Sequence, residues 1–358
     1  QCDIVLWTVM LGAYVDQGQG EMALQLHAEM HKEGVGSDQH SLVFALQACS
    51  LLADKDDDLI SPRETSLKMA ALEIGRTLHA EAHSKDMLSN VFVANALINM
   101  YSKCAIVETA ENVFGAITER NVGSWNGMLS AYVENGEEEK AFWLYHKMKQ
   151  QEVSLNDGTI TCILRVSKTL EVSRTIHFDV VSAEYEQNLS VAASLIHAYG
   201  SCASMTDGQA IFDELHTADL VLWNACTNGH AGEGNFVATL YTFTCLLLVG
   251  ILPDEVSLTL VLSICSHTGH VLEGLEYFEA MMKNHGLNPN LKHYGILLDL
   301  LGRVGDFKRI ANMLVKMPVQ MNLAMWLCLL GACSAHGNVE LAKQAFDNAV
   351  KLQPKLTT

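Results

Sequence analysis

Proline is scarce in this chain, supplying only five of 358 residues. Because proline interrupts helices and cannot pair inside a sheet, its scarcity permits long regular elements. Together with a modest 7% aromatic share, it favours an all-helical protein. Global disorder is excluded, since 49% of the residues are hydrophobic, and the length exceeds that of a single ordinary core.

The ten cysteines lack the spacings that mark a zinc or redox site. No two of them form Cys-x-x-Cys, which excludes a zinc knuckle and a thioredoxin-type motif. Most fall within apolar helical patterns and indicate buried free thiols in a reducing compartment. They are Cys2, Cys49, Cys104, Cys162, Cys202, Cys226, Cys245, Cys265, Cys328 and Cys333.

Motifs for catalysis are also missing. A zinc-dependent nucleobase deaminase needs His-x-Glu together with Pro-Cys-x-x-Cys, and the second motif does not occur. Two histidine pairs, His27/His31 and His79/His83, have the i,i+4 spacing that can seat a metal on one helix face. Neither forms His-Glu-x-x-His, so we expect no catalytic residue, no cofactor and no metal.

Positive charge is in deficit: 23 Lys and Arg face 41 Asp and Glu, for a net charge of −18. Proteins that coat a nucleic-acid backbone need a basic surface, so this balance argues against non-specific nucleic-acid binding. Part of the acidity is confined to one predicted loop, 54–58. No targeting peptide is visible and the chain begins with Gln1, so we expect a targeting segment to be missing.

An internal repeat of 98 residues stands out against these absences. It relates Trp125 to Trp223, Gly136 to Gly234 and many residues between and around them. The other related pairs are Glu73/Glu171, Arg76/Arg174, Thr77/Thr175, His79/His177, Tyr101/Tyr199, Cys104/Cys202 and Phe114/Phe212. Such breadth indicates a duplicated block of smaller repeats.

Each repeat has two amphipathic helices, as unit 122–156 illustrates. Its first half carries an apolar stripe at i, i+3, i+4, i+7 and i+8: Trp125, Met128, Leu129, Tyr132 and Val133. After Asn135-Gly136, a second stripe follows: Ala141, Leu144, Tyr145 and Met148. Neither helix can bury its face alone, so the units must stack. The predicted fold is all-α, a right-handed superhelical α-solenoid of helix-turn-helix repeats.

Nine such units fill residues 1–322, and a shorter extension occupies 323–358. The second unit contains an insertion over about 53–69, which we expect to be a surface loop. The tract 234–253 carries no charge, but the repeat register places it as a second helix, so we expect no membrane insertion. The units are 4–38, 39–90, 91–121, 122–156, 157–188, 189–219, 220–254, 255–290 and 291–322.

These units resemble pentatricopeptide repeats of the plant PLS class, in which P-, L- and S-type repeats alternate. Residues 122–136 resemble a P-type repeat, 72–79 (Leu-Glu-Ile-Gly-Arg-Thr-Leu-His) an L-type repeat and 91–104 an S-type repeat. Residues 293–303 and 326–341 resemble the last repeats and the start of an E extension, truncated here. The resemblance covers essentially the whole chain.

The resemblance implies sequence-specific binding of single-stranded RNA in a mitochondrion or, alternatively, a chloroplast. It implies C-to-U editing or another RNA-processing event, with catalysis by a deaminase-bearing or other editing partner in trans. In this family the fifth residue of a repeat and its last residue, here called a recognition pair, select the base. The pairs are Thr8/Asp38, Asn95/Asn121, Asn126/Asn156, Thr161/Asn188, Asn224/Asp254 and Thr259/Asn290.

By the family's code, Thr with Asp favours G, Asn with Asp favours U, Asn with Asn favours pyrimidines and Thr with Asn favours A. Outside the repeat context, Asn and Thr at these positions would be interpreted as ordinary helix caps. The second residue of a repeat, normally a valine packed on the base, is glycine at Gly123 and Gly158. The fifth residue cannot hydrogen-bond through its side chain at Val43, Ala193 and Gly295.

Two other interpretations compete with RNA binding. Helical-pair solenoids also serve as protein-binding scaffolds, which the acidity and the apolar tract 234–253 favour. The third interpretation is a fragment or decaying copy without function, which the starting residue, the early end and the insertion favour.

Overall fold

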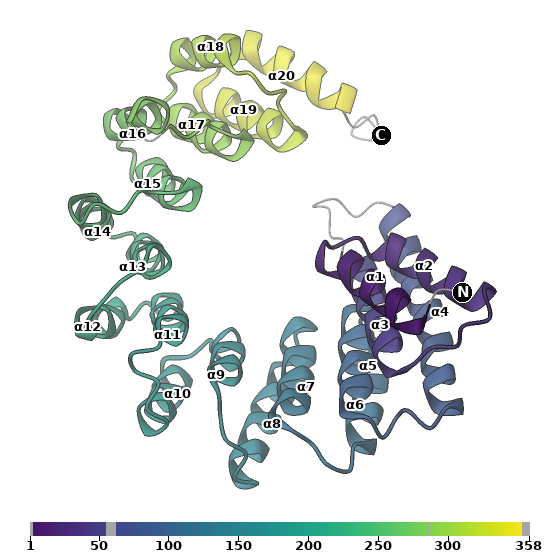
Figure 1. The fold of residues 1–358 in the computed structure, drawn as a ribbon. Coiled ribbons are helices and arrows are strands. Elements are labelled where there is room, and N and C mark those ends of the chain that lie inside the picture. The colour runs from purple at the N-terminus through teal and green to yellow at the C-terminus, as the bar shows by residue number, and fades with distance from the viewer. Residues whose placement is uncertain (1–2, 55–61, 285, 353–358) are drawn as a thin grey trace. The chain divides into compact units, whose positions relative to one another are not determined.

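The computed structural model describes residues 3–54, 62–284 and 286–352. Over these ranges the chain forms twenty α-helices and no β-strand (Figure 1). It divides into two compact units, Gln1–Val166 and Ser167–Thr358. Each unit is a stack of antiparallel helix pairs, so the all-α helical-repeat solenoid is confirmed.

The first compact unit holds α1 to α9. Their bounds are α1 Ile4–Asp16, α2 Gly20–Lys32, α3 Gln39–Ala53, α4 Pro62–Ser84, α5 Val91–Lys103, α6 Val107–Ala116, α7 Val122–Glu134, α8 Glu138–Gln150 and α9 Asp157–Leu164.

The second compact unit holds α10 to α20. Their bounds are α10 Leu170–Ser182, α11 Leu189–Ser201, α12 Met205–Glu214, α13 Leu220–Gly232, α14 Phe236–Leu248, α15 Glu255–Thr268, α16 Val271–Asn284, α17 Leu291–Arg303, α18 Phe307–Lys316, α19 Leu323–His336 and α20 Val339–Leu352. The odd-numbered helices of both units begin at residues 4, 39, 91, 122, 157, 189, 220, 255, 291 and 323, the first residues of the predicted repeats.

Within each compact unit the odd-numbered helices pack on one another as well as on their even-numbered partners, and this explains their two buried faces. In the first compact unit α7 packs against α5, α8 and α9, and its predicted apolar stripe is buried. The even-numbered α8 buries only the four residues of its own stripe, Ala141, Leu144, Tyr145 and Met148. Burial of each large apolar side chain contributes about 1.5–3 kcal/mol, so stacking supplies the stability that one pair lacks.

The inserted segment is more helical than the sequence predicted. The loop expected over about 53–69 begins where predicted, since α3 ends at Ala53, but its C-terminal part is wrong because α4 already begins at Pro62. Proline is favoured at the first helical position, since its fixed φ is helical and its missing N–H would have no partner there. Residues 63–69 contain no glycine or further proline to stop the helix. Residues 55–61 of the insertion lie outside the described residues.

The uncharged tract 234–253 forms α14, the second helix of its repeat. Thr239, Thr242, Phe243 and Leu246 are buried, whereas Val237 and Tyr241 on its other face are exposed. Leu248 and Val249 at its end are exposed as well. Among the described residues, no helix has both the length and the apolar character needed to span a bilayer.

Candidate nucleic-acid interface

Helix capping determines where the recognition pairs lie. The fifth residue of a repeat is in the first turns of an odd-numbered helix, and the last residue is the N-cap of the next odd-numbered helix. Asp254, for example, caps α15 by accepting a hydrogen bond from the backbone N–H of Ser257 at 2.8 Å. Local folding alone therefore favours a short polar side chain at this position.

Asn224 and Asp254 are brought into direct contact. The Asn224 amide nitrogen donates to Asp254 Oδ1 at 3.1 Å. The hydroxyl oxygen of Ser257 lies 2.7 Å from Asn224 Oδ1 and 2.8 Å from Asp254 Oδ1, so its single proton can serve either oxygen. We call these three residues the Asn224 cluster.

The same arrangement occurs 98 residues earlier in the other compact unit. The Asn126 amide nitrogen donates to Asn156 Oδ1 at 2.9 Å, and the Thr159 hydroxyl oxygen lies 2.7 Å from Asn126 Oδ1. Asn156 caps α9 through the backbone N–H of Thr159 at 2.9 Å. We call these residues the Asn126 cluster.

Each cluster fixes an amide while leaving part of it free to bind. An asparagine amide has two N–H donors and two acceptor lone pairs, and the bonds above use one of each. Asn126 and Asn224 are half-buried. Each therefore keeps one donor and one acceptor for an external partner and is already held in position, which lowers the entropy cost of binding.

The last residue of the pair differs chemically between the clusters. Burial alone would raise the pKa of the Asp254 carboxyl, but hydrogen bonds from Ser257 and Asn224 outweigh burial and hold the pKa below its ordinary value of 3.8. Asp254 is therefore an anion that only accepts hydrogen bonds at neutral pH. Asn156, in the equivalent place, presents an amide nitrogen that donates.

Position two of the repeat adjoins each recognition pair. Val221 and Val256, in the repeats that contribute the Asn224 cluster, are 62% and 53% exposed. Gly158 holds the same position at the Asn126 cluster, where an added Cβ would lie 3.4 Å from Asn156 Oδ1 and 3.5 Å from Asn126 Nδ2. The Asn224 cluster thus has exposed valine side chains at position two of its repeats, whereas the Asn126 cluster has no side chain at Gly158.

Two other predicted pairs of the first compact unit are not joined by a hydrogen bond between their described side chains. Thr8 donates to the Ile4 carbonyl at 2.8 Å, while Asp38 caps α3. Asn121 caps α7, and the buried Oδ1 of Asn95 has no hydrogen-bond partner among the residues that the structure describes. An added Cβ at Gly123 would nevertheless lie 3.1 Å from Asn121 Oδ1 and 3.4 Å from Asn95 Nδ2, so both amides flank this glycine.

The remaining predicted residues have separate contacts. Thr259 lies 3.1 Å from Nε2 of the buried His293, and Asn290 donates instead to the Glu255 carboxylate at 3.0 Å. Thr161 donates to the Gly158 carbonyl at 3.2 Å. Asn188 caps α11 by accepting from the backbone N–H groups of Ser190 and Val191.

Sequence reasoning missed the hydroxyl that completes each cluster, at Thr159 and Ser257. Both lie three residues after the cap, a spacing that signals a capping box. That spacing was therefore visible at 156–159 and 254–257. What it did not indicate is that the same hydroxyl also reaches the asparagine of the preceding repeat.

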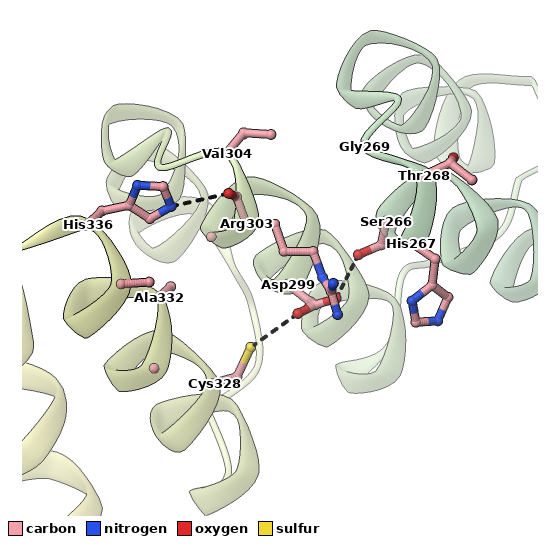
Figure 2. Close-up of a pocket in the computed structure, with 13 residues that line it drawn as sticks. Ser266, His267, Thr268, Gly269, Asp299, Arg303, Val304, Cys328, Ala332 and His336 are labelled. Carbon is pink, nitrogen blue, oxygen red and sulfur yellow. Dashed lines mark hydrogen bonds and ion pairs between the residues drawn. The ribbon is translucent and has the colours of Figure 1, made fainter.

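An open cavity of about 740 Å³ lies at the C-terminal ends of α15, α17 and α19 (Figure 2). Asp299 accepts a hydrogen bond from the Ser266 hydroxyl at 2.7 Å and pairs with Arg303 at 2.8 Å. An added Cβ at Gly331 would meet nothing within 4 Å, so this part of the wall is open. The cavity has room for a small polar ligand beside a guanidinium that is already paired.

Comparisons with known proteins agree with this repeat structure. The PPR repeat family model matches residues 120–166, and the PPR repeat model matches 5–35 and 256–285. The pentatricopeptide repeat-containing protein CRR2, chloroplastic, of Arabidopsis thaliana is 31% identical over 357 residues, covering 98% of this chain and 52% of that protein. The chain thus spans about half the length of this relative.

Solved structures show the same fold. The crystal structure of the pentatricopeptide repeat protein PPR10 from maize has a TM-score of 0.64 at 17% identity, covering 98% of this chain and 54% of that chain. A structure of PPR10 in complex with an 18-nt psaJ RNA element has a TM-score of 0.63 at 14% identity, covering 96% of this chain and 55% of that one. The segments matched by the repeat models coincide with α1–α2, α7–α9 and α15–α16. The chain is therefore a pentatricopeptide repeat protein.

Proposed function

We propose that this protein binds single-stranded RNA sequence-specifically. One observation carries the proposal: the Asn126 and Asn224 clusters hold equivalent amides in the same hydrogen-bonded geometry. Bases splayed from a single strand offer their Watson–Crick edges to such groups. The structural neighbour PPR10 has been crystallised in complex with an 18-nt RNA element, which supports the same kind of ligand for this chain.

The chemistry of the clusters supports different base preferences. Asp254 accepts only, so beside Asn224 it suits a base that donates an imino N–H, as uracil does at N3. Asn156 donates and so suits either pyrimidine, because both carry acceptors on the same edge. This matches the family's code, U for Asn with Asp and pyrimidine for Asn with Asn. The exposed Val221 and Val256 add apolar surface against which a base can pack.

The biological setting follows from the family resemblance. The PLS-like motifs and the E-type start at 323 support a role in C-to-U editing or another RNA-processing event. In the editing role we propose that a partner supplies the deaminase in trans; residues 1–358 contain no Pro-Cys-x-x-Cys motif. We propose that the protein acts in an organelle, the mitochondrion or alternatively the chloroplast. The chloroplastic relative supports the second of these.

The test is selection of bound sequences from a randomised single-stranded RNA pool, using purified 1–358 at near-physiological salt. Enrichment of a motif with G near its 5′ end and pyrimidines inside would support the proposal. Asn126→Ala and Asn224→Ala should each relax the preference at one nucleotide and leave the others unchanged. Thr175→Ala, an exposed change on α10, is the matched control and should alter nothing. An unchanged motif in both asparagine variants would contradict the assignment of these residues.

A protein-binding scaffold is the second candidate function. The exposed apolar side chains of α14 and the net charge of −18 favour it. A folded protein that enriches no RNA motif would favour this candidate over RNA binding.

A further inference from the structure

A second cluster lies apart from the recognition pairs, where α2 meets α4. His27 and His31 are one turn apart on α2, and Glu81 comes from α4 in the next repeat. One nitrogen of each imidazole and one Glu81 carboxylate oxygen all lie within 4.8 Å of one another. His31 Nε2 and Glu81 Oε1 are 3.7 Å apart. The fold thus brings a carboxylate beside a histidine pair for which the sequence alone indicated no third ligand.

The two imidazoles converge on a single point. Nε2 of His27 and Nε2 of His31 lie 3.0 Å and 2.9 Å from the Ser37 hydroxyl oxygen. The same ring nitrogen of each histidine therefore faces a common centre. A tetrahedral zinc ion with bonds of about 2.0–2.2 Å needs its ligand atoms roughly 3.4 Å apart. Side-chain rotations that move the two imidazole nitrogens and the Glu81 carboxylate oxygen by about 1 Å would bring them to that spacing.

The burial of the three side chains is uneven. His27 is only 6% exposed. The His31 and Glu81 side chains are 39% and 20% exposed. The cluster is therefore reachable from solvent on the side of His31 and Glu81. Both imidazoles must be neutral and Glu81 ionised to bind a metal.

We propose that His27, His31 and Glu81 form a binding site for a divalent transition metal of the zinc type, with the Ser37 hydroxyl or a solvent molecule as the fourth ligand. Two imidazoles and one carboxylate are an established ligand combination for zinc. Bound metal links α2 and the segment after it to α4, and so joins two adjacent repeats on their even-numbered helices. Its role is structural, and it is independent of RNA binding.

Lys85 competes with a metal ion for the Glu81 carboxylate. Its ammonium group bonds Glu81 at 2.8 Å and the Ser37 carbonyl at 2.9 Å. Without metal, this positive charge neutralises the carboxylate. Because a second cation nearby disfavours metal binding, Lys85→Met should increase metal affinity several-fold.

The second histidine pair supplies a matched control. His79 and His83 have the same i,i+4 spacing on α4, but Nδ1 of His79 bonds the Tyr101 hydroxyl at 2.8 Å. No third ligand joins them within the described residues. His83→Gln therefore changes a histidine of the same type at the same spacing without touching the proposed site.

The experiment is titration of the metal-free purified protein with Zn²⁺ and Co²⁺. We expect one tight equivalent per chain, a rise in the melting temperature, and visible Co²⁺ bands typical of tetrahedral nitrogen and oxygen ligands. His31→Gln and Glu81→Gln change side chains that are 39% and 20% exposed, so these variants should stay folded by circular dichroism. Each should weaken binding at least tenfold, whereas His83→Gln should bind like the parent protein.

Three outcomes would overturn the proposal. The first is no saturable equivalent in folded protein. The second is equal loss of binding in His83→Gln. The third is a near-ultraviolet thiolate charge-transfer band with Co²⁺, which would assign the bound metal to cysteine.

Discussion

Asp254 and Asn156 occupy equivalent places 98 residues apart and differ in one terminal atom, an oxygen in the first and an amide nitrogen in the second. Both cap the next odd-numbered helix through a capping box. Asp254→Asn should therefore keep the cap, because Asn156 already performs it in the same setting. The base preference at this position should relax from U to both pyrimidines, with U binding weakened by about tenfold or less, a change of about 1.4 kcal/mol.

Fluorescence anisotropy with two RNAs that differ only at this nucleotide measures the change. Asn156→Asp is the reciprocal variant and should narrow the base preference at the nucleotide read by Asn126 and residue 156 from both pyrimidines to U. If the U-to-C ratio were the same in the parent and both variants, the last residue of the pair would have no part in base choice.

Backbone conformation gives a second residue-scale prediction. Ala105 and Ala203 have φ of 60° and 51°, in the left-handed region, whereas Gly136 at the corresponding turn has φ of 74°. A side chain in this region costs about 1–2 kcal/mol, partly offset by the greater unfolded-state freedom of glycine. Ala105→Gly should therefore stabilise the fold by about 0.5–1 kcal/mol, seen as a higher urea midpoint. Gly136→Ala should lower that midpoint, and the same sign for both variants would contradict the argument.

At the scale of elements, a repeated histidine–tyrosine bond joins an even-numbered helix to the odd-numbered helix that follows it. His79 bonds Tyr101 between α4 and α5 at 2.8 Å, and His177 bonds Tyr199 between α10 and α11 at 3.0 Å. Burial, joined at His79 by the charge of His83, holds the pKa of both histidines below the ordinary 6.5. Both imidazoles are therefore held neutral in the fold.

This pKa shift sets the direction of a pH dependence. As the pH falls below 6.5, these histidines take up a proton in the unfolded chain but stay neutral in the folded chain. The free energy of unfolding therefore decreases until the pH reaches the pKa of the folded state. The loss is at most about 1.4 kcal/mol per pH unit for each histidine. His177→Gln removes one such group, so its unfolding free energy should fall less when the pH is lowered from about 7 to about 5. Parallel pH profiles for the parent and His177→Gln, measured by urea titration, would exclude this contribution.

Whether a feature could be predicted from the sequence depends on whether it is local in the chain. The stripe from Trp125 to Val133 predicted α7 and its buried face, because helical periodicity is written into neighbouring residues. The bridging hydroxyls of Thr159 and Ser257 and the approach of Glu81 to His27 could not be predicted in this way. They depend on how one repeat packs on the next, over separations of about 30 to 50 residues. The prediction of a loop after Pro62 was wrong for a different reason: the polar residues there indicated exposure to solvent, and an exposed segment can still be helical.

At the scale of the whole molecule, the charge balance limits how RNA can be held. The chain carries −18, and several of its cations are already paired with carboxylates. Lys103 lies 2.9 Å from Asp54 and 3.3 Å from Glu134, and Arg303 lies 2.8 Å from Asp299. A phosphate that approached either cation would have to compete with these carboxylates. Contacts to bases, rather than to the phosphate backbone, should therefore supply most of the affinity.

This charge balance predicts a weak salt dependence for binding of the selected RNA. Each phosphate contact on a single strand contributes a slope of about −0.7 to the logarithm of affinity against the logarithm of salt concentration. With two or fewer such contacts, we expect a slope no steeper than about −1.5. Anisotropy titrations over a tenfold range of potassium chloride measure it. Asn224→Ala should lower the affinity at every salt concentration without changing the slope, because it removes a neutral contact. A slope of about −3 or steeper would show that the backbone is held by several cations, and the proposed dominance of base contacts would be wrong.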